Sequence, residues 1–144
     1  MILAGNIVQA AELAKVTPQV IEIFTTTDPS VAGEAAISQQ PDYREIKFYV
    51  YELDGIQRIE TKLSIGLTAD PEQSKRVVLQ RFQQLHDDDR AQMQRAAIGL
   101  AKAAQYGVDR YPVIVFDGDV AIYGVTDISE ALHRYQQWRE GGKQ

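Results

Sequence analysis

A short hairpin in the C-terminal part of the sequence constrains the fold more than any other feature. Two runs of β-branched and aromatic residues, 113–116 and 120–123, flank the triplet Asp117-Gly118-Asp119. Asp-Gly is a favoured pair in tight hairpin turns, because the central residues of such turns need a positive φ. The two runs are therefore expected to be neighbouring antiparallel strands, and any fold of the chain has to include this pair.

The first third of the sequence predicts a strand, a short helix and a second strand. The run 20–24 is β-branched and aromatic, and it stops at a Thr-rich stretch followed by Pro29. Residues 30–39 are small and Ala-rich, which favours a short helix with Ser30 as its N-cap. Apolar and polar residues alternate from about 45 to 52, the pattern of a half-buried strand.

The middle of the sequence has helical periodicity instead. Apolar residues recur three and four positions apart between about 55 and 106, which predicts three helices in series. Asp70-Pro71 and the acidic run 87–89 mark helix starts, and Gly107 is a plausible C-cap. A last helix is expected to begin at Thr126 or Asp127 and to end at the glycines 141–142.

Composition and charge exclude several classes of function. The 144 residues include no cysteine, which removes thiol redox chemistry, disulfides, iron–sulfur ligation and Cys-ligated zinc. A net charge of -5 without a basic patch disfavours direct nucleic-acid binding. No apolar stretch approaches the roughly 20 residues of a membrane span. Thr and Ser are weak nucleophiles without an adjacent base, so the sequence indicates a non-catalytic protein with no cofactor.

The order strand, helix, strand, helical segment, hairpin, helix is that of a thioredoxin-like α/β fold with a helical insertion. Tyr111-Pro112 before the penultimate strand and Gly124 after the last strand also resemble thioredoxin-fold proteins. That resemblance implies a cis bond at Pro112, packed beside the end of the first strand. We expect a mixed sheet in a domain spanning 18–140, with the insertion at about 55–106, and tails at 1–17 and 141–144.

Four sequence segments carry a resemblance to a narrower family within this fold, and the resemblance runs from about Val20 to Trp138. They are IEIFTTTD at 21–28, YELDGI at 51–56, YGVDRYPVIVFDG at 106–118 and YGVTDI at 123–128. Together they resemble the thioredoxin-like accessory proteins of integrating conjugative elements, a family without an assigned activity. The resemblance implies a periplasmic protein that works with protein components of a type IV secretion apparatus. No Lys or Arg precedes the apolar residues of 1–17, which form an ordinary helix or tail or a signal-peptide remnant.

The same resemblance points to a candidate groove for a partner protein or peptide. In thiol-active relatives of the fold the reactive pair follows the first strand, where this chain has threonines, and the loop before the penultimate strand presents a free backbone edge. The candidate groove residues are Thr25, Thr26, Thr27, Asp28, Arg110, Tyr111 and Pro112. The plainer interpretation of the threonines is strand-end and helix-capping chemistry, which we weigh well ahead of catalysis.

Two alternatives to partner binding in this groove stay open, and metal binding is not expected. The groove could take a small thiol or an anion through Arg110 and backbone N–H groups at a helix start. Alternatively, the chain could be a scaffold whose partner contacts the helical insertion near Phe82 and Arg90. His86 lies directly before three aspartates, but adjacent residues rarely converge on one ion, and a helix start explains the acids. His133 is expected on a helix surface.

Overall fold

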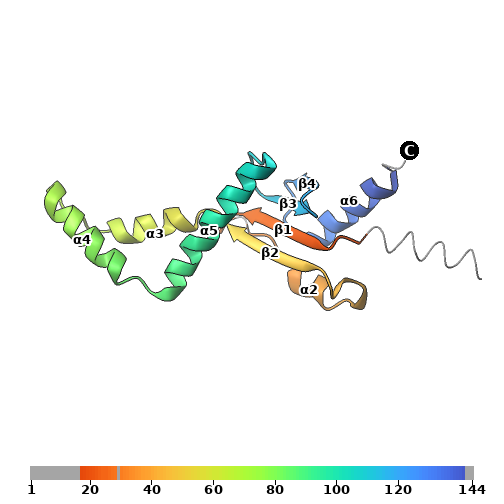
Figure 1. The fold of residues 1–144 in the computed structure, drawn as a ribbon, viewed down its shortest axis with the longest axis horizontal. Coiled ribbons are helices and arrows are strands. Elements are labelled where there is room, and N and C mark those ends of the chain that lie inside the picture. The colour runs from red at the N-terminus through yellow and green to blue at the C-terminus, as the bar shows by residue number, and fades with distance from the viewer. Residues whose placement is uncertain (1–16, 29, 142–144) are drawn as a thin grey trace, which may run out of the picture. The chain divides into compact units, whose positions relative to one another are not determined.

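A computed structural model describes residues 17–28 and 30–141 (Figure 1). Within them the chain forms two compact units. The first combines residues 17–50 with 110–141, and the second is Tyr51–Asp109. Most of the expected N-terminal tail, 1–16, and the end of the C-terminal tail, 142–144, lie outside the described residues.

The first unit is built on a four-stranded sheet with the order β2-β1-β3-β4. Its strands are β1 Val20–Thr25, β2 Lys47–Glu52, β3 Val113–Phe116 and β4 Val120–Tyr123, so β2 extends two residues past the division between the units. β3 pairs antiparallel with both β1 and β4, whereas the arrows of β1 and β2 run the same way (Figure 1). This mixed sheet confirms the expected strands and the thioredoxin-like α/β fold.

The hairpin between β3 and β4 turns at the expected Asp-Gly pair. Asp117 and Gly118 both have a positive φ, 53° and 66°, and the Asp119 N–H donates to the Phe116 carbonyl at 3.0 Å. An aspartate tolerates this left-handed backbone better than most residues, and glycine adopts it freely. The turn therefore keeps the strand register in which Phe116 faces Val120.

One face of the sheet carries the main hydrophobic core, beneath helix α6, Ile128–Gly141. Asp127 begins this helix as expected, because its Oδ1 accepts the backbone N–H groups of Ser129 at 2.8 Å and Glu130 at 3.3 Å. The rings of Phe116 and Tyr135 stack with centroids 4.5 Å apart and planes 9° from parallel. The buried cluster comprises Ile21, Ile23, Ile37, Ile46, Ile114, Phe116, Val125, Ile128, Ala131, Leu132 and Tyr135.

The helix expected at 30–39 is much shorter, and its expected cap at Ser30 is wrong. Helix α2 is Glu34–Ser38, its N-cap is Gly33, and a 3₁₀ turn η1, Pro41–Tyr43, follows. The physical reason lies at Ala32, whose N–H donates to the Thr126 carbonyl at 2.8 Å and whose carbonyl accepts the Ile128 N–H at 2.9 Å. This bridge to the start of α6 uses the backbone groups of Ala32, so a helix cannot begin before it.

The second unit contains the three helices expected from the periodicity: α3 Gly55–Ser64, α4 Pro71–Gln83 and α5 Asp87–Tyr106. Asp70 caps α4 by accepting the Glu72 N–H at 3.1 Å, and Gly107 ends α5. Lys62 Nζ lies 2.7 Å from Asp89 Oδ2 and joins α3 to the first turn of α5. Among the described residues, no helix has the length and apolar character needed to cross a bilayer.

Candidate functional site

The threonine-rich stretch leaves the sheet at the C-terminal end of β1. Thr25 is buried, Thr26 is half-buried, and Thr27 and Asp28 are exposed. The Thr25 hydroxyl donates to the Thr26 carbonyl at 3.2 Å, and the Thr26 hydroxyl donates to the Asp28 carbonyl at 3.1 Å. The first two hydroxyls therefore hold a local turn in which a side chain bonds nearby backbone.

None of these threonines occupies the N-cap position of the helix that follows, which is Gly33. Helix α2 begins at Glu34, nine positions after Thr25, and its N-cap residue makes no side-chain hydrogen bond to the helix. The Thr25 and Thr26 hydroxyls each donate to a nearby carbonyl. Strand-end chemistry is the part of the plainer interpretation that agrees with these contacts. Helix α2, the helix whose backbone N–H groups the anion alternative would use, begins at Glu34 rather than directly after the strand.

The loop before β3 lies beside this strand end. The Tyr111–Pro112 peptide bond is cis, as the resemblance to thioredoxin-fold proteins implied. Phe24 of β1 pairs with Val113 of β3 in antiparallel register, so the next residue of β1, Thr25, comes next to Pro112. On its other side, the Pro112 carbonyl accepts the Gly124 N–H at 2.9 Å. The fold thus brings together the two chain segments of the candidate groove.

Arg110 and Tyr111 form the exposed wall of this loop. The Arg110 guanidinium lies over the Tyr123 ring, 4.6 Å from its centroid, which fixes the arginine by a cation–π contact. Tyr111 is 40% exposed. Within the described part of the chain, its backbone N–H and carbonyl take part in no hydrogen bond. A peptide backbone could therefore bond there without displacing a contact within that part of the chain.

A match to a known protein family covers one of the two chain segments of the candidate groove. Residues 35–141 match the family "Protein of unknown function (DUF1525)". The chain belongs to the DUF1525 family. The DUF1525 match includes Arg110, Tyr111 and Pro112 but begins after the threonines of β1. No curated protein and no solved structure matches the chain.

Neither histidine of this DUF1525 protein lies in a cluster of metal-ligating side chains. His86 is exposed and is the N-cap position of α5, and His133 is exposed on α6, as expected. The acids 87–89 occupy the first turn of α5, where they complement the helix dipole. Across residues 17–28 and 30–141, no three His, Asp or Glu side chains gather in a way that could hold a metal ion.

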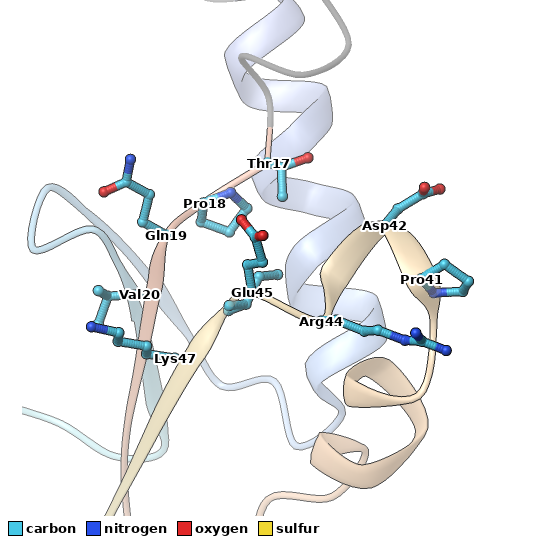
Figure 2. Close-up of a pocket in the computed structure, with 10 residues that line it drawn as sticks. Thr17, Pro18, Gln19, Val20, Pro41, Asp42, Arg44, Glu45 and Lys47 are labelled. Atoms are coloured by element: carbon cyan, nitrogen blue, oxygen red, sulfur yellow. The ribbon is translucent and has the colours of Figure 1, made fainter.

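A hollow of about 600 Å³ at the opposite end of β1 was missed by sequence reasoning (Figure 2). It lies where β1 and β2 begin, next to η1. Four of its residues alternate in charge, Asp42, Arg44, Glu45 and Lys47, and this alternation in 42–47 is the only sequence signal for it. The full lining is Thr17, Pro18, Gln19, Val20, Pro41, Asp42, Arg44, Glu45, Ile46 and Lys47. Its walls carry both charges, which favours no single class of ligand.

Proposed function

We propose that this chain binds an extended segment of a partner protein along the loop at Tyr111–Pro112. The protein is a non-catalytic accessory factor in this proposal, and its partner is a component of a conjugative transfer apparatus. The single observation that carries the proposal is the backbone of the exposed residue Tyr111, which takes part in no hydrogen bond within the described part of the chain and is separated from β3 by one residue, Pro112.

The neighbouring contacts support peptide binding more than small-molecule turnover. Strand addition needs a rigid backbone edge with free donors and acceptors, and the side chains around it set specificity. β3 is buried along its whole length, and Arg110 is held over Tyr123. The loop therefore connects to the rigid part of the fold. The sequence supplies no thiol at the positions where thiol-active relatives of the fold react, so binding is the activity that these residues favour.

The conjugative setting and the periplasmic location come from the sequence resemblance described above. In this proposal the conjugative setting identifies the partner, and the periplasm is the compartment in which the protein acts. Cell fractionation of donor cells tests the location directly. Recovery of the protein with cytoplasmic markers would contradict a periplasmic role.

Site-specific photo-crosslinking in donor cells tests the groove. The residue at 111 is replaced by p-benzoylphenylalanine, an aromatic side chain that an exposed position accepts. The same replacement at Trp138, which is an exposed aromatic residue on α6, is the matched control. We expect cross-links to transfer-apparatus proteins from position 111 and none from position 138. Equal cross-linking from both positions, or none from position 111, would contradict the groove.

A conjugation assay tests the biological role separately. The chromosomal copy is replaced by Tyr111→Ala combined with Thr26→Ala, and circular dichroism checks that the variant folds. We expect a fall in transfer frequency comparable to that caused by deletion, with Trp138→Ala unchanged. Normal transfer in the deletion strain would overturn the accessory role, whereas loss only in the deletion strain would place the function outside the groove.

A further inference from the structure

Strand β2 leaves one edge of the sheet open. In the order β2-β1-β3-β4 it has a neighbour on one side only among the described strands. It is six residues long and contains no proline or glycine, the residues that commonly interrupt an edge strand. An uninterrupted strand at the edge of a sheet is a template on which another strand can pair.

The hydrogen-bond pattern shows which backbone groups of β2 face this open edge. The Lys47 N–H donates at 3.0 Å to the carbonyl of Gln19, the residue directly before β1. Because the backbone groups of successive strand residues point to opposite sides, those of Lys47 and Tyr49 face β1. The N–H and carbonyl groups of Phe48 and Val50 therefore face the open edge. Within the described chain, neither of these two residues bonds through its backbone to a turn, loop or helix.

The side chains at the centre of β2 are apolar or aromatic. Phe48 and Val50 pack against the main core but are only half-buried. Tyr49, on the other face of the strand, is 45% exposed. A strand that pairs at this edge therefore needs apolar residues opposite Phe48 and Val50 and an uncharged residue opposite Tyr49.

We propose that the open edge of β2 pairs with the same edge of a second copy of this chain. The two β2 strands run antiparallel around a two-fold axis at Tyr49, so that Phe48 of each copy lies opposite Val50 of the other. Each of these pairs exchanges both of its backbone hydrogen bonds, and the two sheets join into one. The second copy is the occupant because it meets all three side-chain requirements at once, including the aromatic and β-branched pairs that stabilise neighbouring strands.

Other registers of the same two strands meet conflicts. An axis at Phe48 would need the Ile46 N–H, which already donates to the Tyr43 carbonyl at 3.2 Å. An axis at Val50 would place the exposed Glu52 carboxylate opposite an aromatic side chain. The axis between these two positions avoids both conflicts, so the proposal fixes one register.

Disulfide trapping tests this register, because the chain has no cysteine of its own. Residues that meet at such an axis have Cα atoms about 4.5 Å apart, which a disulfide can span. Tyr49→Cys should therefore form a disulfide-linked dimer under mild oxidation. Lys47→Cys is the matched control on the same face of the same strand. Its two copies would be separated by roughly 13 Å along the strands, too far for a disulfide.

Sedimentation velocity on the full chain over a concentration series measures the association without a covalent link. We expect the wild type to move from monomer to dimer as concentration rises, because two short strands bury less area than a permanent dimer needs. Tyr49→Lys places two positive charges opposite each other and should raise the dissociation constant by about fivefold or more. Tyr49→Thr, with a neutral residue that is common in strands, should still dimerise. Circular dichroism confirms that each variant folds.

Three outcomes would overturn the proposal. One is a wild type that is monomeric at every concentration, whether or not it binds a synthetic strand peptide. Another is equal disulfide formation at positions 47 and 49, which would indicate random collision. The third is the same dissociation constant for Tyr49→Lys and Tyr49→Thr, which would show that the copies do not meet at Tyr49. These variants leave the loop at Tyr111–Pro112 unchanged, so their outcome is independent of the proposed function.

Discussion

Asp117 and Val20 bind each other through two hydrogen bonds that run in opposite directions. The Asp117 carboxylate accepts the Val20 N–H at 2.9 Å, and the Asp117 N–H donates to the Val20 carbonyl at 2.9 Å. The same carboxylate oxygen also accepts the Gln19 N–H at 2.8 Å. The hairpin turn therefore fixes the beginning of β1, nearly a hundred residues earlier in the chain, and with it the register of the central strand pair.

Replacing Asp117 separates this contact from the backbone requirement of the turn. Asp117→Gly removes the carboxylate but keeps the positive φ. We expect a loss of about 1–2 kcal/mol of unfolding free energy, because the hydrogen bonds from the Gln19 and Val20 N–H groups to the carboxylate disappear. Asp117→Ala should lose about 1 kcal/mol more, because a Cβ disfavours the left-handed backbone. Asp117→Asn keeps an acceptor oxygen and should lose least. Urea unfolding of the three variants measures this order, and equal losses would contradict a role for the carboxylate.

Gly99 marks a close approach between α5 and the end of β2. A Cβ at this position would lie 2.6 Å from the Cβ of Tyr51 and 2.8 Å from Cδ2 of Leu53. Gly99→Ala should therefore cost about 1–3 kcal/mol through overpacking, although alanine normally stabilises a helix interior by about 1 kcal/mol relative to glycine. Thermal or urea unfolding shows whether Gly99→Ala lowers or raises the free energy of unfolding. Ala97→Ser at an exposed site on the same helix is the control, and a stabilised Gly99→Ala variant would contradict the contact.

Local signals predicted most of the fold. Asp70 and Asp127 were expected at helix starts, and both accept backbone N–H groups there. The Asp-Gly pair predicted the β3–β4 hairpin, and the three central helices follow the apolar spacing. These features succeed because capping, turn geometry and helical periodicity depend on residues within a few positions of one another.

The features that escaped prediction depend on partners far along the chain. The start of α2 is set by the bridge between Ala32 and the residues before α6. The contacts of Arg81 also depend on residues far along the chain, because it donates to the carbonyls of Leu63 and Ile65 at the end of another helix. In the candidate groove, the register at Phe24 and Val113 brings Thr25 next to Pro112. Only the resemblance to thioredoxin-fold proteins suggested that neighbourhood, because nothing in the local sequence of either segment encodes it.

Arg81 should contribute more to stability than an ordinary surface arginine. Its two hydrogen bonds are charge-assisted and satisfy the carbonyls of Leu63 and Ile65 at the end of α3. Arg81→Met keeps much of the apolar stem, and we expect a loss of about 1–2 kcal/mol together with faster hydrogen exchange in the last turn of α3. Arg134→Met is the matched control, because its pair with Glu130 is exposed on both sides and should be worth less than about 0.5 kcal/mol. Equal effects of the two substitutions would show that Arg81 acts only as a surface charge.

Tyr135 should make the first unit sensitive to alkaline pH. Burial raises the pKa of its phenol above the ordinary value of 10.0; the carboxylates of Asp117 and Asp119 add to the rise, and Arg139 opposes it. The folded state then holds this proton more tightly than the unfolded state, so stability falls as pH increases from about 10 through the folded pKa. Tyr135→Phe preserves the stacked ring on Phe116 and removes the titrating group. We expect its urea midpoint to decline less steeply above pH 10 than that of the wild type. The near-ultraviolet absorbance of the phenolate measures the titration itself. The absorbance that the wild type gains over the variant belongs to Tyr135, and it should develop at a higher pH than the absorbance of an exposed tyrosine. A parallel decline of the two midpoints would mean that Tyr135 ionises equally well in both states.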